Sequence, residues 1–297
     1  MEIEEALYFF RKNKGLKQKE ILHYTDSSVY SRIENGKKFL KYSELRTILK
    51  NLSVPLVEFS EYLDDDLEQK KFRQLMREYN ASPTSSEVKQ KLVDYYSAIT
   101  FSSSLDSALM SNYIGLKLLF YPSWKEIDPI KQSELNVIFN LLNDKEYFFQ
   151  YDYALLAHTI FLFDKKKRKQ LATKALPIKN IHLRNTATKE FIKNMLNNLI
   201  TTFLREEEYE QSLYYLSLES SQSEDSHDLS YIIVLNYLTN LTKYLMTKEP
   251  IYKQKIEETI NYLNSIGETK FASSIEREVT ALIKGERDIP IFIQAGL

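Results

Sequence analysis

Residues 17–36, KQKEILHYTDSSVYSRIENG, decide the fold of the N-terminal part of the chain. The pattern predicts two short helices, at about 17–24 and 27–35, joined by a tight turn. Thr25 and Asp26 are suited to cap the second helix, and Gly36 supplies the left-handed residue that ends it. Two helices at this spacing are typical of a helix-turn-helix, whose second helix enters the major groove of DNA.

Three more helices are expected around this motif, at about 3–13, 43–51 and 55–62. Gly15 is placed to end the first of them, and Pro55 fits the first turn of the last. Together the helices form a predicted five-helix unit over residues 1–63. Its core is predicted from apolar residues at helical spacing, which are Ala6, Leu7, Phe9, Phe10, Ile21, Leu22, Tyr30, Ile33, Leu45, Ile48, Leu49, Leu56, Phe59 and Leu63.

A concentration of positive charge accompanies this unit, although the whole chain has a formal net charge of −1. Residues 11–50 contain eleven Lys or Arg and only four Asp or Glu, which gives a local net charge of +7. A positive field of this kind attracts phosphate groups. A solvated lysine-rich surface is the alternative, and the helix-turn-helix pattern favours nucleic-acid binding over it.

Several classes of protein are excluded by composition and by missing motifs. The chain has no cysteine, which excludes disulfides, thiolate catalysis and cysteine-based zinc sites. Its four histidines are dispersed, and it has no HExxH, GxSxG, GxGxxG or phosphate-loop motif. The N-terminal segment is charged and the apolar runs are short, so we expect no secretory signal and no membrane span. We therefore expect a cytoplasmic protein that is not an enzyme and holds no cofactor or metal.

The rest of the chain is predicted to be a helical array. Glycine and proline are scarce and the amphipathic runs are long, which predicts an all-α protein. Asp66 is suited to cap a linker helix in residues 64–83, and Asp128-Pro129 is a helix start signal. Ten helices are expected after the linker, at about 85–101, 104–121, 128–143, 146–164, 165–176, 184–206, 208–221, 228–247, 250–265 and 268–284.

A loose repeat indicates how these helices are arranged. The segment FLREEEYEQSLYYL at 203–216 resembles YLMTKEPIYKQKIEETINYL at 244–263, and Tyr209 and Tyr252 are 43 residues apart. The repeat predicts helix pairs stacked as a right-handed, tetratricopeptide-like solenoid over residues 84–297. The apolar segment 289–297 is expected to cap the last repeat or to pack on a dimer partner.

The N-terminal unit also resembles a known family. Arg11, the segment GLKQKEI at 15–21 and the segment SRIENG at 31–36 resemble the XRE-type helix-turn-helix of phage repressors and many bacterial regulators. The resemblance implies that Arg11 and Glu34 form a structural ion pair between the first helix and the recognition helix. It also implies a DNA-binding set, with Gln18 at a phosphate, Ser27, Ser28, Val29 and Arg32 in the groove, and Lys37, Lys38 and Lys41 on the backbone.

Arg32 is the residue of this set with the most specific chemistry. A guanidinium group can pair with guanine O6 and N7, which discriminates against other bases by about 1–3 kcal/mol. A phosphate contact or a surface ion pair is the alternative role for Arg32. Helix capping is the alternative role for Ser27 and Ser28.

The order of segments along the chain narrows the resemblance. An XRE-type head, the acidic run at 64–66 and the helical array after it resemble the Rgg/MutR family of Gram-positive regulators. Trp124 and the aromatic stretch 139–163 are similar to the mid-chain segment of that family, although the usual Trp and Glu there are missing. The resemblance implies a cytoplasmic homodimer that binds double-stranded DNA and holds a short signalling peptide in the concave face of the array.

Candidate peptide-binding residues follow from the chemistry that such a groove needs. A bound peptide requires amide and guanidinium partners for its backbone and aromatic walls for its side chains. Asparagine is a mediocre helix former, so its clusters within apolar helices indicate a polar role. A surface or inter-helix role is the alternative for each residue, and a core position is the alternative to acid sensing for His158. The candidates are Tyr153, His158, Asn194, Asn197, Asn198, Arg205, Asn236, Tyr237 and Asn240.

Two other functions are consistent with a helical array. The array could be a protein-interaction scaffold that sequesters a partner, with the head serving no purpose. Gln18, Arg32 and the basic cluster speak against that hypothesis. The chain could also be a phage-type repressor that responds to no ligand, and the length of the array speaks against it.

Overall fold

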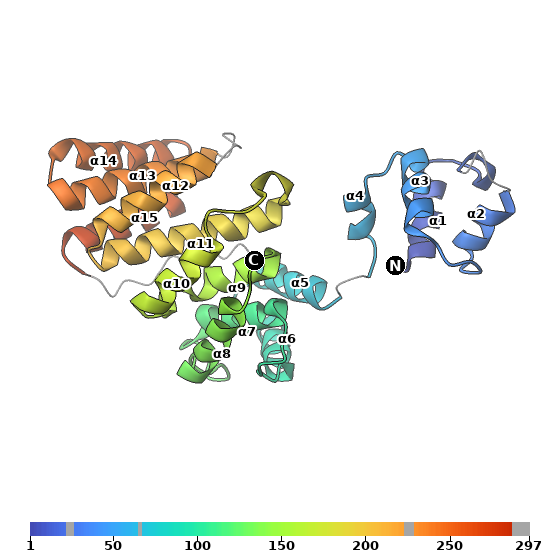
Figure 1. Cartoon of the computed structure of the whole chain (residues 1–297), viewed down its shortest axis with the longest axis horizontal. Helices are drawn as coiled ribbons and strands as arrows, with labels where there is room; N and C mark the ends of the chain where they lie inside the picture. Colours follow the sequence, from blue (N-terminus) through green and yellow to red (C-terminus); the bar gives the residue numbers. More distant parts are fainter. Residues whose placement is uncertain (22–26, 65–66, 223–228, 287–297) are drawn as a thin grey trace. The chain divides into compact units, whose positions relative to one another are not determined.

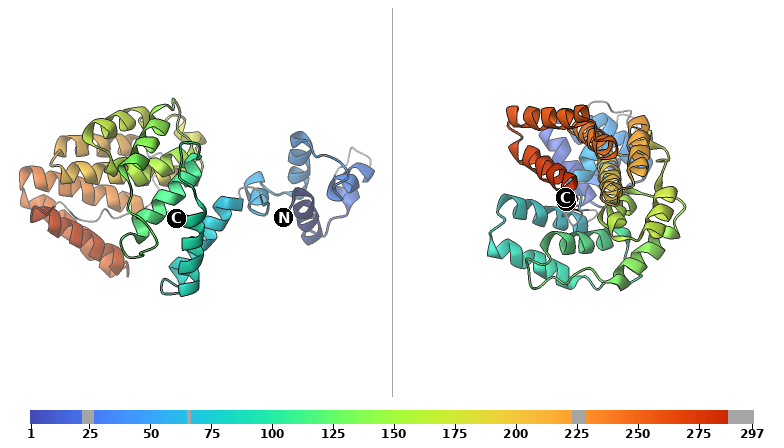
Figure 2. Two further views of the ribbon diagram at one scale, coloured as in Figure 1. Left: turned by 90° about the horizontal axis from the view of Figure 1, so that it is seen from below. Right: turned by 90° about the vertical axis from the view of Figure 1, so that its left-hand side faces the viewer.

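The computed structural model describes residues 1–21, 27–64, 67–222 and 229–286. Within these ranges all regular structure is helical, as the sequence predicts. The chain divides into two compact units, Met1–Gln74 and Leu75–Leu297, which Figures 1 and 2 show in sequence colours. The predictions made for Leu22, Thr25, Asp26, Asp66 and the segment 289–297 lie outside the described residues.

The first unit contains the helices expected for a helix-turn-helix domain. The described part of the predicted second helix is a single 3-10 turn, η1. Gly36, at φ +66°, ends α2, and the backbone N–H of Lys37 donates to the carbonyl of Arg32 across this stop. The elements are α1 (Ile3–Asn13), η1 (Gln18–Glu20), α2 (Ser27–Glu34), α3 (Tyr42–Leu52) and α4 (Leu56–Glu61), followed by α5 (Leu67–Ala81), within which the unit boundary falls.

The core of the first unit uses most of the predicted apolar residues. Tyr30 and Ile33 are buried on one stripe of α2, so the opposite stripe of this helix is left for solvent. Phe9 and Leu56 were expected inside and are more than a third exposed. Phe9 lies at the edge, against Phe10 and Tyr62, and the short helix α4 buries only Phe59.

The second unit is a stack of helices that begins within α5. Figures 1 and 2 show these helices wound into a curved stack. The predicted start of α8 at Asp128-Pro129 is wrong, because Lys131 is the N-cap and its backbone N–H donates to Glu134. The helices are α6 (Ser86–Ala98), α7 (Ser107–Phe120), α8 (Gln132–Asn143), α9 (Gln150–Thr159), η2 (Ile160–Leu162), α10 (Lys165–Ala175), η3 (Ile181–Leu183), α11 (Thr186–Arg205), α12 (Tyr209–Gln222), α13 (Leu229–Thr247), α14 (Pro250–Ser265) and α15 (Thr269–Ile283).

Consecutive packing from α11 to α15 accounts for the sequence repeat. Each of these helices packs on the next one along the chain, and α11 also packs on α9. Glu207 and Lys248 both adopt φ +61° in the turns that precede α12 and α14, so the two turns share a backbone conformation. Tyr209 is the first residue of α12 and Tyr252 the third residue of α14, so the two similar segments both enter the second helix of a pair, with a register difference of two residues.

None of the helices in the described residues combines the length and the apolar character that crossing a membrane requires.

Candidate DNA-binding face and ligand groove

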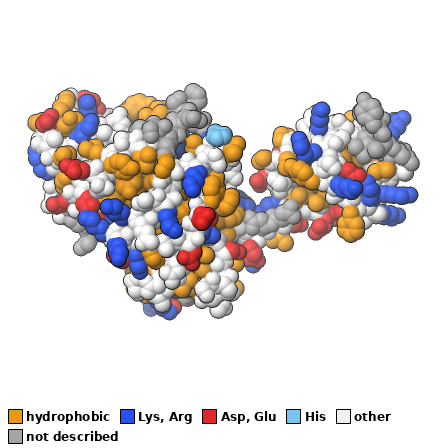
Figure 3. Space-filling model, in the orientation of Figure 1, with side chains coloured by type: hydrophobic (Ala, Val, Ile, Leu, Met, Phe, Trp, Pro, Cys, Tyr) orange, Lys and Arg blue, Asp and Glu red, His pale blue; other side chains and the backbone are white. Residues whose placement is uncertain are grey.

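The outer stripe of α2 carries the predicted groove-facing residues. Ser28 and Arg32 are exposed, and Val29 is half-buried against the core of the first unit. The backbone of Ser27 opens the helix. Figure 3 shows Lys and Arg side chains projecting from the end of this unit that carries α2. The stripe therefore presents a cation and a small hydroxyl group at neighbouring positions, the groups that a recognition helix uses.

An ion pair between α1 and α2 fixes the orientation of this stripe. The Nε of Arg11 lies 2.7 Å from Oε1 of Glu34, and its Nη2 lies 3.0 Å from Oε2. Both side chains are buried, and Nη1 of Arg11 also donates to the carbonyl of Leu16. Gln18 donates its amide N–H to Oε2 of Glu34 at 2.5 Å, which ties η1 to the same carboxylate. The pair implied by the family resemblance is therefore present, and Gln18 belongs to its network.

The three lysines after α2 differ in how they are held. Lys37 and Lys41 are exposed. Lys38 is part-buried, with its Nζ 2.5 Å from Oε1 of Glu44. Hydrogen bonds from the Lys38 side chain and from the backbone N–H of Lys41 lower the pKa of Glu44. A phosphate bound by Lys38 would therefore compete with Glu44 for the ammonium group of this lysine.

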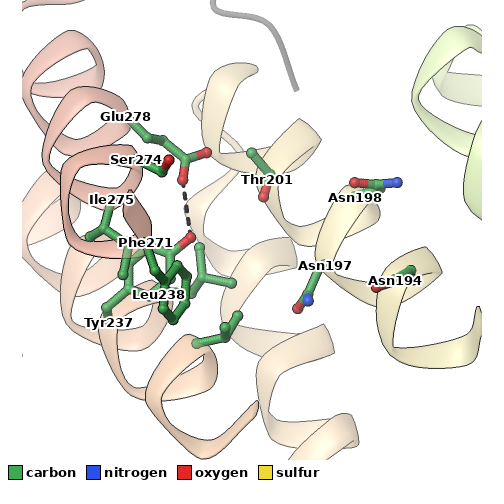
Figure 4. A pocket seen from close by; sticks show the side chains of 11 residues that line it. Asn194, Asn197, Asn198, Thr201, Tyr237, Leu238, Phe271, Ser274, Ile275 and Glu278 are labelled. Carbon is green, nitrogen blue, oxygen red and sulfur yellow. Dashed lines mark hydrogen bonds between the residues drawn. The ribbon is translucent and has the colours of Figure 1, made fainter. Parts of the chain in front are cut away.

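A groove in the second unit is formed by three alternate helices, α11, α13 and α15 (Figure 4). Its cavity measures about 50 Å³. Asparagine amides come from α11, and apolar and aromatic side chains come from α13 and α15. The residues of this ligand groove are Asn194, Asn197, Asn198, Thr201, Val234, Tyr237, Leu238, Phe271, Ser274, Ile275 and Glu278.

The polar groups of the ligand groove are unequally satisfied. Oδ1 of Asn197 is buried and has no hydrogen-bond partner among the residues that the structure describes. The side-chain amide of Asn198 donates to the backbone carbonyl of Ala157, so this amide joins α11 to α9. An acceptor that is buried and unpaired costs stability unless a ligand or water satisfies it.

An ionisable cluster closes one end of the groove. The hydroxyl of Tyr237 donates to Oε2 of Glu278 at 3.0 Å, and Nη2 of Arg205 lies 3.9 Å from Oε1. Burial raises the pKa of Tyr237 and of Glu278, and burial lowers the pKa of Arg205. The three groups place a guanidinium, a carboxyl and a phenol group next to the groove in a poorly hydrated setting.

Four of the nine predicted peptide-binding residues line this groove, namely Asn194, Asn197, Asn198 and Tyr237. Arg205 reaches it through Glu278. Asn236 and Asn240 do not line this groove. They line an open hollow of about 660 Å³ between α13 and α14, where the side-chain amide of Asn240 donates to the backbone carbonyl of Asn236.

Tyr153 and His158 are buried on α9, so the structure corrects their assignment to a ligand surface. The Tyr153 hydroxyl donates to the carbonyl of Ala175, and burial raises the pKa of Tyr153 to about 12. Nδ1 of His158 lies 3.1 Å from both oxygens of Ser111 on α7. His158 is therefore a residue of the helix-packing core.

Seven groove residues on α11, α13 and α15 were missed by sequence reasoning, which are Thr201, Val234, Leu238, Phe271, Ser274, Ile275 and Glu278. The helix α15 reads as an ordinary amphipathic helix, and nothing in its spacing indicates which neighbour it faces. Within the described ranges, no group of three or more histidine or acidic side chains is placed to hold a metal ion.

The fold defines a helix-turn-helix protein with a helical-repeat C-terminal domain. The family model for the C-terminal domain of the HTH-type transcriptional regulator Rgg matches residues 84–277. The chain therefore belongs to the Rgg family of transcriptional regulators.

Solved structures share this fold at low sequence identity. The PrgX/cCF10 complex matches with a TM-score of 0.74 and 16% identity, covering 97% of this chain and 94% of PrgX. The SHP pheromone receptor Rgg2 of Streptococcus dysgalactiae matches with a TM-score of 0.73 and 15% identity, covering 94% of this chain and 99% of Rgg2. A putative transcriptional regulator from Listeria monocytogenes EGD-e matches with a TM-score of 0.74 and 17% identity, covering 96% of this chain and 98% of that regulator. No curated protein sequence matches the chain significantly.

Proposed function

We propose that this chain is a cytoplasmic, homodimeric, sequence-specific regulator whose DNA binding is modulated by a short signalling peptide in the ligand groove. The recognition helix is α2, with Ser27, Ser28, Val29 and Arg32 at the bases. Lys37, Lys38 and Lys41 contact phosphates, and Gln18 contacts one with the part of its amide group that is not bonded to Glu34. In a symmetric dimer, two such heads contact half-sites about one helical turn (~34 Å) apart.

One observation carries the peptide part of this proposal, namely the unpaired Oδ1 of Asn197 in the groove. An extended peptide presents a backbone N–H at every second residue on one side, and such a group would satisfy this acceptor. Val234, Leu238 and Ile275 form an apolar wall beside it, suited to one aliphatic side chain of the ligand. PrgX has been solved with cCF10 and Rgg2 is described as a pheromone receptor, which agrees with this assignment.

Peptide binding would alter DNA binding through differential affinity. A ligand shifts an equilibrium between two dimer states only by the ratio of its affinities for them. Oδ1 of Asn197 is unsatisfied in the ligand-free groove. The peptide should therefore bind more tightly to the dimer state in which a backbone N–H of the peptide reaches this oxygen.

We predict that Asn197→Ala weakens peptide binding about 3–10-fold, the value of one neutral hydrogen bond. Isothermal titration of the full chain with synthetic short peptides encoded beside the gene measures the change. Asn264→Ala, an exposed asparagine on α14, is the matched control and should bind as the wild type does. If no such peptide binds the wild type, or if Asn197→Ala binds equally well, the groove is not the peptide site.

We predict that Arg32→Ala lowers the affinity for the operator about 10–100-fold and relaxes sequence preference at one base pair. Gel shifts with the operator and with a scrambled duplex measure both effects. Lys41→Ala should instead weaken binding to both duplexes to a similar extent, because a phosphate contact carries no sequence information. A wild type that binds both duplexes equally would refute sequence-specific recognition.

A further inference from the structure

The loop between α2 and α3 exposes two aromatic side chains beside the DNA-binding face. Phe39 is 98% exposed and Tyr42, the first residue of α3, is 63% exposed. The neighbouring Leu40 is half-buried against the core of the first unit. Leu40 therefore anchors the loop while Phe39 points away from the protein, so the exposure of Phe39 is a consequence of the loop geometry.

The charges around Phe39 select the kind of partner. Lys37 and Lys41 lie two residues to either side of it and are exposed. Glu44 is the only acidic residue in 35–47, and it already accepts from the side chain of Lys38 and the backbone N–H of Lys41. The surface is thus an aromatic ring between two exposed lysines, which complements a polyanion that also offers apolar groups.

We propose that Phe39 contacts duplex DNA, with its ring packed on a deoxyribose or a thymine methyl next to the phosphates held by Lys37 and Lys41. This inference rests on the proposed function, because it takes α2 as the recognition helix. The loop directly follows α2, so it must run along the DNA backbone when α2 lies in the major groove. Deoxyribose carbons and thymine methyl groups are the apolar surfaces of that region, and burying a phenyl ring against them removes apolar area from water.

The salt dependence of binding separates this contact from an ionic one. The probe is a duplex of about 30 bp, long enough for two half-sites, that the wild-type chain selects from a random library. Phe39→Ala should lower the affinity about 3–10-fold at every salt concentration, because an apolar contact releases no counterions. Lys37→Ala should lower the affinity and also reduce the slope of log K against log[salt] by about 0.9.

Matched variants test whether the loss of affinity comes from altered folding or from the loss of any exposed apolar side chain. Val57→Ala removes another exposed apolar side chain of the same unit, in α4, and should leave the affinity unchanged. Phe39→Leu should retain part of the affinity. Thermal denaturation of Phe39→Ala should match the wild type, since the ring makes no core contact. Replacing thymine with uracil in the selected duplex assigns the Phe39 contact to the thymine methyl if the affinity falls more for the wild type than for Phe39→Ala, and to deoxyribose if both lose the same affinity.

Three results would overturn the inference: an affinity of Phe39→Ala within about twofold of the wild type, a salt slope reduced as in Lys37→Ala, or altered self-association in the absence of DNA. The last result would assign Phe39 to a protein contact. A wild type that enriches no sequence from the library defeats the proposed function, and this inference with it. A wild type that enriches a sequence which Phe39→Ala binds equally well defeats the inference alone.

Discussion

Replacing Glu34 with alanine is expected to lower the free energy of unfolding of the first unit by about 3–5 kcal/mol. The variant leaves the guanidinium of Arg11 buried without its two carboxylate contacts at 2.7 and 3.0 Å. The loss also frees the amide of Gln18. Since small units have only about 5–15 kcal/mol of stability, α2 would be poorly formed and operator binding would fall with it. Hydrogen exchange followed by mass spectrometry measures the two units separately, and only the first should lose protection.

Two variants test whether the buried charge is the cause. Glu44→Ala removes a part-exposed acid that pairs with Lys38 in the same unit, and should cost less than about 1 kcal/mol. The double variant Arg11→Met/Glu34→Leu should recover most of the lost stability, because no unpaired buried charge remains. If Glu34→Ala proves as stable as Glu44→Ala, the pair does not hold α1 to α2.

Local signals made the first unit predictable from its sequence. The apolar spacing of α1 and the Asn-Gly stop after α2 each lie within one helix and its cap. Neighbouring residues in the sequence therefore determine where these two helices begin or end. Leu56 shows the limit of this reasoning. A helix as short as α4 buries one side chain, and periodicity does not decide between Leu56 and Phe59.

The ligand groove could be predicted only in part, because its walls come from helices far apart in the sequence. Asn236 and Tyr237 are adjacent, yet about 100° of helical rotation puts them on different sides of α13. Sequence clustering of polar residues identifies the helix and not the side that faces the ligand. Glu278 depends on the docking of α15 against α13, which no local pattern specifies.

The place of His158 was also decided by a distant residue. Gly115 on α7 lies against the imidazole, and a Cβ there would approach Cε1 of His158 at 3.2 Å. A larger residue at 115 would require the ring to move, so the glycine makes the room in which His158 is buried. The sequence allows both an acid sensor and a core residue, and the α7–α9 packing selects the core.

Burial of His158 leads to an expected dependence of stability on pH. Desolvation lowers the pKa of His158 from its ordinary value to about 4, opposed by a hydrogen bond to the backbone of Ser111. Below pH 6.5 the unfolded chain therefore binds a proton that the folded chain does not, and stability falls as pH falls. The contribution of His158 should decrease by about 2 kcal/mol between pH 7 and pH 5 and approach about 3 kcal/mol of loss near pH 4.

Urea denaturation of the second unit at several pH values, followed by hydrogen exchange, measures this dependence. His158→Gln should remove the decrease between pH 7 and pH 5, even though the variant is less stable at neutral pH. His182→Gln changes an exposed histidine and should keep the full decrease. The comparison uses the slope against pH, so other titrating groups such as Glu278 cancel between variants. An unchanged slope in His158→Gln would mean that the imidazole is protonated inside the folded array, which its contacts with Gly115 and Ser111 argue against.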